Sequence, residues 1–208
     1  MAAPNLAELV EPSSTAVLTS ECQGGTLGAD AVFPALRDAA RDVGLVTQLA
    51  DLLTAARSAG VVVLHAVAQN RADRAGANHN ARLFAAAARG PVALLEGTPA
   101  AEVVPELGPA PTDIVSRRTH GLSPTAGTDV DAILRNLGVR TVVLTGVSVN
   151  VAITNAAFDL VNLGYNVVLP TDAVAGVGER YVADVIANTL SLVTTLTTVA
   201  ELLSVWAG

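Results

Sequence analysis

The residues best suited to chemistry lie in three short polar segments, each of which follows an apolar run. Ser20-Glu21-Cys22-Gln23 offers a carboxyl group, and Ser116-Arg117-Arg118-Thr119-His120 offers two guanidinium groups. The third segment, Gly146–Ala152, precedes a helical pattern. A carboxyl group can move a proton, a guanidinium fork suits a carboxylate, and a helix N-terminus carries partial positive charge. These residue types predict acid–base chemistry on a small organic acid.

Several chemistries are excluded by what the chain lacks. All 12 basic residues are arginine, so no amine of adjustable pKa exists for Schiff-base catalysis. The single cysteine, Cys22, excludes an intrachain disulfide and a multi-cysteine metal site. The three histidines lack the close spacing of metal ligands, the nearest acid–histidine pair being Asp73 and His79. We therefore expect no metal and no cofactor.

The net charge of −7 argues against a nucleic-acid partner, which requires clustered basic residues. No charge-free apolar run approaches the roughly 18 residues of a membrane span. Glu8 and Glu11 occupy the region where a signal peptide carries positive charge. We expect a cytoplasmic protein that does not bind membranes.

The elements that must position these residues alternate between β-rich apolar runs and helical patterns, which is typical of βαβ units and a parallel sheet. Strands are predicted at Thr15–Thr19, Val61–Ala66, Ile114–Ser116, Thr141–Gly146, Asn166–Leu169 and, less clearly, Ser191–Thr194. Because ligands bind at the carboxyl ends of parallel strands, the three polar segments should converge on one edge of the sheet.

Helices are predicted between the strands from apolar residues at helical spacing. One covers 45–56 and ends before Gly60, and another covers 130–137 and ends at Gly138, opened by a capping box of Thr128 with Asp131. Others are expected over 151–163, 179–190 and 196–206. The polar segment 69–97, with a helical piece at 80–88, is interpreted as an excursion over the active-site edge or an ordinary surface insertion. Nothing divides the chain, so 1–208 is expected to form one domain.

Motifs along nearly the whole chain resemble those of the isochorismatase-like cysteine hydrolases in their residues, order and spacing. They are Ala16–Gly25, Glu96-Gly97-Thr98-Pro99, Glu106-Leu107, Asp113–Arg117, Gly127-Thr128, Leu134–Val139, Val142–Val147 and Gly164–Ala173. The resemblance implies an α/β fold, a three-layer α/β/α sandwich with a mostly parallel sheet of about six strands. It also implies a homo-oligomer, for which the C-terminal segment with Trp206 is either a contact surface or part of the core.

In that family an aspartate, a lysine and a cysteine form the catalytic set. The matching positions here hold Glu21, Arg117 and Ala152, with Arg118 as an alternative to Arg117. Alanine cannot act as a nucleophile, so amide hydrolysis through a thioester is not expected. Cys22 should point away from Glu21 by strand alternation, and Ser148 more plausibly shapes a turn, often cis in the family, than acts as a nucleophile.

Two hypotheses of different class follow. The first is a hydrolase that cleaves a small carboxylated metabolite without a covalent intermediate, as the family members that act on isochorismate do. Glu21 would be the general acid, Arg117 the anion clamp, and Ala152 would leave room for substrate or water. The charge of Arg117, however, would oppose protonation of Glu21. The second is an inactive descendant that binds an organic acid or a protein partner. Both expect a substrate-binding set of Gln23, Arg118, His120, Val147, Ser148 and Asn150.

Overall fold

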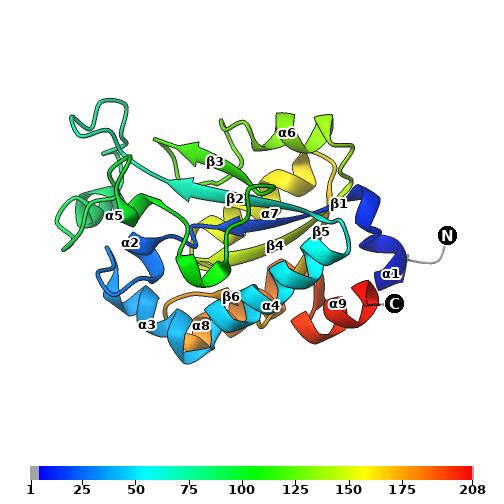
Figure 1. The fold of residues 1–208 in the computed structure, drawn as a ribbon. Helices are drawn as coiled ribbons and strands as arrows, with labels where there is room; N and C mark the ends of the chain where they lie inside the picture. The colour runs from blue at the N-terminus through cyan, green and yellow to red at the C-terminus, as the bar shows by residue number, and fades with distance from the viewer. Residues whose placement is uncertain (1–4, 208) are drawn as a thin grey trace.

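A seven-stranded sheet forms the centre of the computed structural model, which describes residues 5–207 (Figure 1). The strands are β1 (Thr15–Ser20), β2 (Val62–Ala68), β3 (Ile114–Arg118), β4 (Thr141–Val147), β5 (Asn166–Pro170), β6 (Val174–Ala175) and β7 (Thr195–Thr197). Their order is β3-β2-β1-β4-β5-β7, with β6 also paired to β4. Every pairing among them is parallel.

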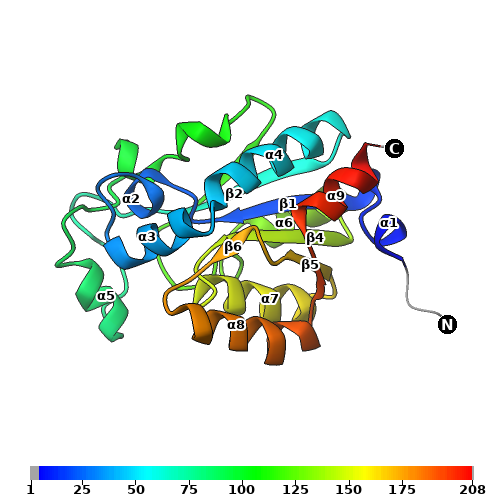
Figure 2. The ribbon, with the colours of Figure 1, turned by 90° about the horizontal axis from the view of Figure 1, so that it is seen from below.

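Helices cover both faces of the sheet, as the predicted three-layer sandwich requires (Figure 2). Within residues 5–207 they are α1 (Leu6–Leu9), α2 (Gly24–Leu27), α3 (Pro34–Asp42), α4 (Leu45–Ser58), α5 (Arg82–Ala87), α6 (Val130–Asn136), α7 (Ala152–Asn162), α8 (Glu179–Asn188) and α9 (Val199–Trp206). Short 3₁₀ turns lie at Pro12–Ser14, Pro99–Ala101, Pro105–Leu107 and Leu190–Leu192.

Strand alternation divides the core into two aliphatic clusters, one on each face. Val17 of β1 packs with residues of α3, α4 and α9, whereas its neighbours Ala16 and Leu18 pack with residues of α6 and α7. Because successive side chains of a strand point to opposite faces, an unbroken apolar run is what a strand covered on both sides needs. This explains why the predicted strands read as continuous apolar runs.

Most of the predicted elements, the last helix among them, are confirmed within one to three residues, but one predicted strand and one predicted capping box are not. The predicted strand Ser191–Thr194 is wrong, because 190–192 form a 3₁₀ turn and β7 begins at Thr195. The last helix begins at Val199, because Thr198 caps it in a capping box with Glu201. The predicted capping box of Thr128 is absent, since Asp129 is the N-cap residue of α6 and makes no side-chain capping bond. The helix α3 was not predicted.

The strand order reverses between β1 and β4, which are hydrogen-bonded neighbours although β2 and β3 come between them in the sequence. At this switch point Ser20 pairs with Gly146. Gly146 has a φ of 99°, and a Cβ atom there would lie 2.4 Å from the carbonyl oxygen of Ser20. Only glycine fits this close approach, which brings the ends of β1 and β4 together.

Among the helices in residues 5–207, none is both long and apolar enough to cross a membrane.

Candidate active site

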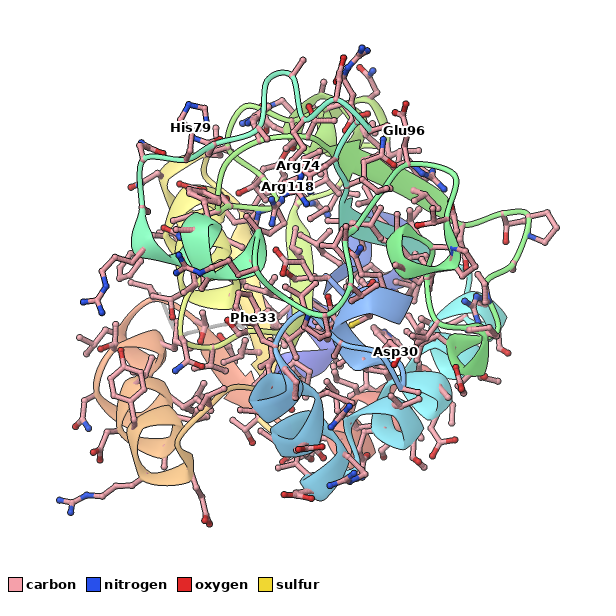
Figure 3. All side chains as sticks on the ribbon, turned by 90° about the vertical axis from the view of Figure 1, so that its left-hand side faces the viewer. Asp30, Phe33, Arg74, His79, Glu96 and Arg118 are labelled. Carbon is pink, nitrogen blue, oxygen red and sulfur yellow. The ribbon has the colours of Figure 1, made fainter. Side chains whose placement is uncertain are left out.

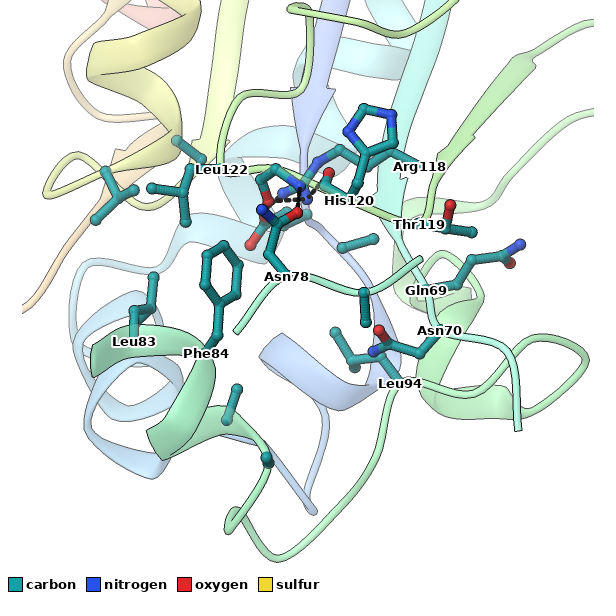
Figure 4. Close-up of a pocket in the computed structure, with 18 of the residues that line it drawn as sticks. Gln69, Asn70, Asn78, Leu83, Phe84, Leu94, Arg118, Thr119, His120 and Leu122 are labelled. Carbon is teal, nitrogen blue, oxygen red and sulfur yellow. Dashed lines mark hydrogen bonds and ion pairs between the residues drawn. The ribbon is translucent and has the colours of Figure 1, made fainter. Parts of the chain in front are cut away.

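A cavity of about 320 Å³ opens at the carboxyl ends of the central strands (Figure 4). Its lining includes Glu21 after β1, Arg118 at the end of β3, His120 beyond it, and Ser148 and Ala152 after β4. The three polar segments singled out in the sequence therefore meet at one edge of the sheet. Figure 3 looks at this end of the molecule, with Arg118 near its centre.

Glu21 is the first residue after β1 and is held in an unusual backbone conformation. Its φ is 53°, a region that non-glycine residues rarely adopt, and its N–H donates to the carbonyl oxygen of Ala66 at 2.8 Å. This turn directs the carboxyl group to the cavity. Burial raises the pKa of Glu21, while the charge and the hydrogen bond of Arg118 act in the opposite direction, and the pKa remains above its ordinary value.

Arg118 is the arginine of β3 that lines the cavity. It is 8% exposed, forms an ion pair with Glu21, and donates to the carbonyl oxygens of His120 at 3.3 Å and Gly121 at 2.9 Å. Its Nε atom is buried without a hydrogen-bond partner among residues 5–207. The side chain is therefore held in place beside Glu21 at the cavity.

Arg117 lies outside the cavity, contrary to the expected pairing with Glu21. It neighbours Arg118 on β3, so its side chain points to the opposite face of the strand. There it forms an ion pair of 2.7 Å with Glu102, with 37% and 49% of the two side chains exposed. The sequence-based choice between the two arginines is corrected by this geometry: Arg118, not Arg117, lies beside Glu21.

The N-terminus of α7 forms the other side of the site. The peptide bond between Val147 and Ser148 is cis, and the carbonyl oxygen of Ser148 accepts hydrogen bonds from the N–H groups of Val151 and Ile153. This turn begins α7 at Ala152, whose side chain lines the cavity with Ser148. The partial positive charge of a helix N-terminus thus lies beside Ala152 at the edge of the cavity.

Three residues of the expected substrate-binding set do not line the cavity. Gln23 is fully buried, and its amide group binds Ala68 through both its oxygen and its nitrogen, at 2.7 Å each. Asn150 likewise binds the backbone of Val177 at 2.7 and 2.9 Å. Val147 is buried in the core. These side chains fix the loops around the site, and His120, Ser148 and Arg118 remain as lining residues.

Cys22 faces the core rather than the cavity. It is 1% exposed, and its thiol donates to the carbonyl oxygen of Ser20 at 3.5 Å. Burial and the nearby charge of Glu21 raise the pKa of this thiol. A buried thiol with a raised pKa is a poor nucleophile. No group of three His, Cys, Asp or Glu side chains in residues 5–207 is arranged to hold a metal ion.

The segment 69–97 contributes cavity residues that the sequence analysis did not identify. Asn78 and the apolar side chains of Leu83, Phe84 and Leu94 line the cavity from this segment. Its interpretation as an excursion over the active-site edge therefore fits the geometry. The individual residues gave no signal, because an alanine-rich helix with a leucine and a phenylalanine is as typical of a surface helix as of a pocket wall.

Comparison with known proteins identifies one family. A sequence model described as the isochorismatase domain matches residues 15–201. A ureidoacrylate amidohydrolase RutB of Rhizobium rhizogenes is 29% identical over 187 residues, which cover 83% of this chain and 75% of that protein.

Solved structures give the same result. A cysteine hydrolase from Pseudomonas syringae pv. phaseolicola aligns with a TM-score of 0.79 and 25% identity over 100% of this chain and 99% of that one. An isochorismatase family protein from Desulfovibrio vulgaris aligns with a TM-score of 0.78 and 30% identity over 94% and 99% of the two chains.

Proposed function

Because the chain belongs to the isochorismatase family of hydrolases, we propose that it hydrolyses a small carboxylated metabolite without a covalent cysteine intermediate. The observation that carries the proposal is the Glu21–Arg118 pair, which lies in a cavity together with Ala152. In this assignment Glu21 is the general acid, Arg118 binds the substrate carboxylate, and Ala152 leaves room for substrate or water.

The reaction that suits this set is cleavage of a vinyl ether. Glu21 donates its proton to the terminal vinyl carbon, and water adds to the resulting oxocarbenium carbon. The hemiketal then breaks its bond to the leaving oxygen, which takes a proton and departs as an alcohol, while a ketone remains. No protein nucleophile takes part, so alanine at position 152 is compatible with every step. Amide hydrolysis through a thioester requires a cysteine there.

Substrate binding removes the main obstacle to acid catalysis. In the empty site, the charge of Arg118 and its hydrogen bond lower the pKa of Glu21, although burial dominates. A substrate carboxylate on Arg118 would neutralise this cation and compete for its N–H groups. The pKa of Glu21 then rises further, and the protonated acid becomes the favoured form.

The first test is release of pyruvate from isochorismate, the vinyl ether that the family resemblance suggests. We expect release by the wild-type protein and by protein treated with iodoacetamide, since Cys22 is buried. We expect Glu21→Gln to lower kcat at least about 100-fold, as loss of a general acid does, with the circular dichroism spectrum unchanged. Turnover by Glu21→Gln at the wild-type rate would contradict the assignment.

A second candidate function is binding without catalysis. It is favoured by the ion pair itself, because the charge of Arg118 favours the ionised form of Glu21, which cannot act as a general acid. This candidate expects saturable thermal stabilisation by small organic acids, no product from isochorismate, and no loss of binding in Glu21→Gln. The two candidates therefore differ in whether the wild-type protein releases pyruvate from isochorismate.

A further inference from the structure

We propose that α5 is a substrate-recognition element, and that Leu83 and Phe84 bind the apolar body of a small carboxylic acid. This inference rests on the proposed function for one point only, the position of the carboxylate at Arg118. It adds the chemistry of the rest of the ligand, namely a ring or a branched hydrocarbon group.

The first observation is that α5 buries none of its residues. Leu83 is 36% exposed, and neither Leu83 nor Phe84 belongs to the two core clusters. Both side chains nevertheless line the cavity. Packing of the protein core therefore does not account for two large apolar side chains here, whereas contact with an apolar ligand does.

The second observation is that Leu83 and Phe84 lie on one side of the cavity, whereas Arg118, Thr119 and His120 lie on the other (Figure 4). Phe33, Leu94 and Leu122 add to the apolar lining. Glu21 and Arg118, the partly or fully buried charged residues of the lining, pair with one another at the strand ends. Two other basic residues of the lining, Arg74 and His79, come from the segment 69–97 and are exposed to solvent. A ligand with a carboxylate at one end and hydrocarbon at the other fits this division.

The third observation is that hydrogen bonds hold the backbone on both sides of α5. The apolar side of the cavity, with Leu83 and Phe84, is therefore formed before a ligand binds. The two ends of the excursion are joined by hydrogen bonds from the N–H of Asn70 to Leu94 at 2.6 Å and from Glu96 to Asn70 at 3.0 Å. Between them, Asn78 accepts a hydrogen bond from the N–H of Gly121 at 2.8 Å. A preformed apolar wall binds with little cost in conformational entropy.

The test compares two probes that have no bond to hydrolyse, cyclohexanecarboxylate and acetate, by NMR titration of the full chain. Wild-type protein should bind cyclohexanecarboxylate at least about tenfold more tightly than acetate, because the ring buries hydrocarbon against the wall. Phe84→Ala should weaken cyclohexanecarboxylate about tenfold and leave acetate unchanged. Phe84→Leu should restore part of the affinity.

Phe158→Ala is the matched control, since Phe158 is a 41% exposed residue of α7 that is not part of the cavity lining. It should bind both probes as the wild type does. Equal affinity of the wild type for the two probes, or no saturable binding of either, overturns the proposal. So does a Phe84→Ala variant that retains the preference for the ring. Because these readouts need no turnover, an inactive protein that shows the preference contradicts only the proposed hydrolysis.

Discussion

Arg117 and Arg118 are neighbours in the chain with opposite surroundings, and this difference can be measured. Arg118 is buried against Glu21, whereas the pair of Arg117 with Glu102 is exposed to solvent. Breaking a buried ion pair leaves an uncompensated charge in the interior, whereas an exposed pair contributes little. The two residues therefore offer a comparison of the same chemical change in two environments.

We expect Arg118→Gln to lower the free energy of unfolding by about 3 kcal/mol at pH 8, and Arg117→Gln by less than about 1 kcal/mol. Without Arg118, the pKa of Glu21 rises further above its ordinary value. A carboxyl group with a raised pKa in the folded state loses its stabilising contribution as the pH rises through that pKa. The loss of unfolding free energy caused by Arg118→Gln should therefore be smaller at pH 5 than at pH 8. Urea unfolding at both pH values measures it, and an equal deficit would contradict the expected titration of Glu21.

The sequence indicated which residue types meet at the site but not every side chain's direction. Glu21 and Ala152 could be identified because motif order and strand ends placed them. The direction of Arg117 depended on where β3 stops, and the strand continues to Arg118 where the sequence suggested an end at Ser116. Because strand side chains alternate, the direction of a residue beyond the predicted end of a strand is undetermined.

At the scale of elements, a buried polar network links β1, β2 and α4 to the loop that precedes β3. The imidazole of His65 is hydrogen-bonded to Thr19 at 2.7 Å and to Asp113 at 3.2 Å. Asp113 accepts two hydrogen bonds from Arg57, at 3.1 and 2.7 Å. Burial would raise the pKa of Asp113, but the hydrogen bonds from Arg57, Ala110 and His65 and the charge of Arg57 lower it below its ordinary value.

We expect Asp113→Asn to lower the free energy of unfolding by about 2–4 kcal/mol at pH 7, because it removes the negative charge that pairs with Arg57 and replaces one of the two acceptor oxygens with an amide donor. A carboxyl group with a lowered pKa stabilises the fold above its ordinary pKa and loses this contribution as the pH falls. The difference from wild type should therefore diminish toward pH 3.

Guanidinium unfolding across this pH range makes the measurement for Asp113→Asn. Asp184→Asn is the control, since its pair with Arg180 is 3.9 Å long and exposed. A cost for Asp113→Asn as small as that of the control would show that the network is not stabilising.

Elements with strong periodicity were predictable, and those fixed by local capping were not. The helix α4 starts at Leu45 as predicted, because its apolar residues recur at helical spacing. The predicted start of the last helix at Leu196 rested on the apolar pattern alone. The capping hydrogen bonds of Thr198 with Glu201 place the start of α9 at Val199 instead. The helix α3 begins with Pro34 and is rich in charged residues, so apolar periodicity gave little signal.

At the scale of the whole molecule, Trp206 joins the two terminal regions of the chain. It lies at the end of α9, packs against the core cluster on the α4 side of the sheet, and donates from its indole N–H to the carbonyl oxygen of Val10 at 3.0 Å. Of the two roles that the sequence left open for the last helix, the geometry favours the core. Figure 1 shows α1 and α9 at the same end of the molecule.

We expect Trp206→Ala to lower the free energy of unfolding by about 2–3 kcal/mol, because a partly buried indole ring and its hydrogen bond are both lost. Trp206→Phe should cost about 1 kcal/mol, since the ring packing is mostly kept. Leu192→Ala, at an 80% exposed apolar residue, should stay within about 0.5 kcal/mol of wild type. Urea unfolding measures all three, and a Trp206→Ala protein as stable as Leu192→Ala would show that α9 is not needed to hold the fold together.

The position of β4 next to β1 means that the cavity is completed late during synthesis. A ribosome that has released the chain as far as His120 has already delivered Glu21 and Arg118, but not Ser148 and Ala152, which also line the cavity. These two residues follow β4, whose end pairs with β1 through Gly146 and Ser20. The cavity is therefore complete only once the second half of the sheet has joined the first.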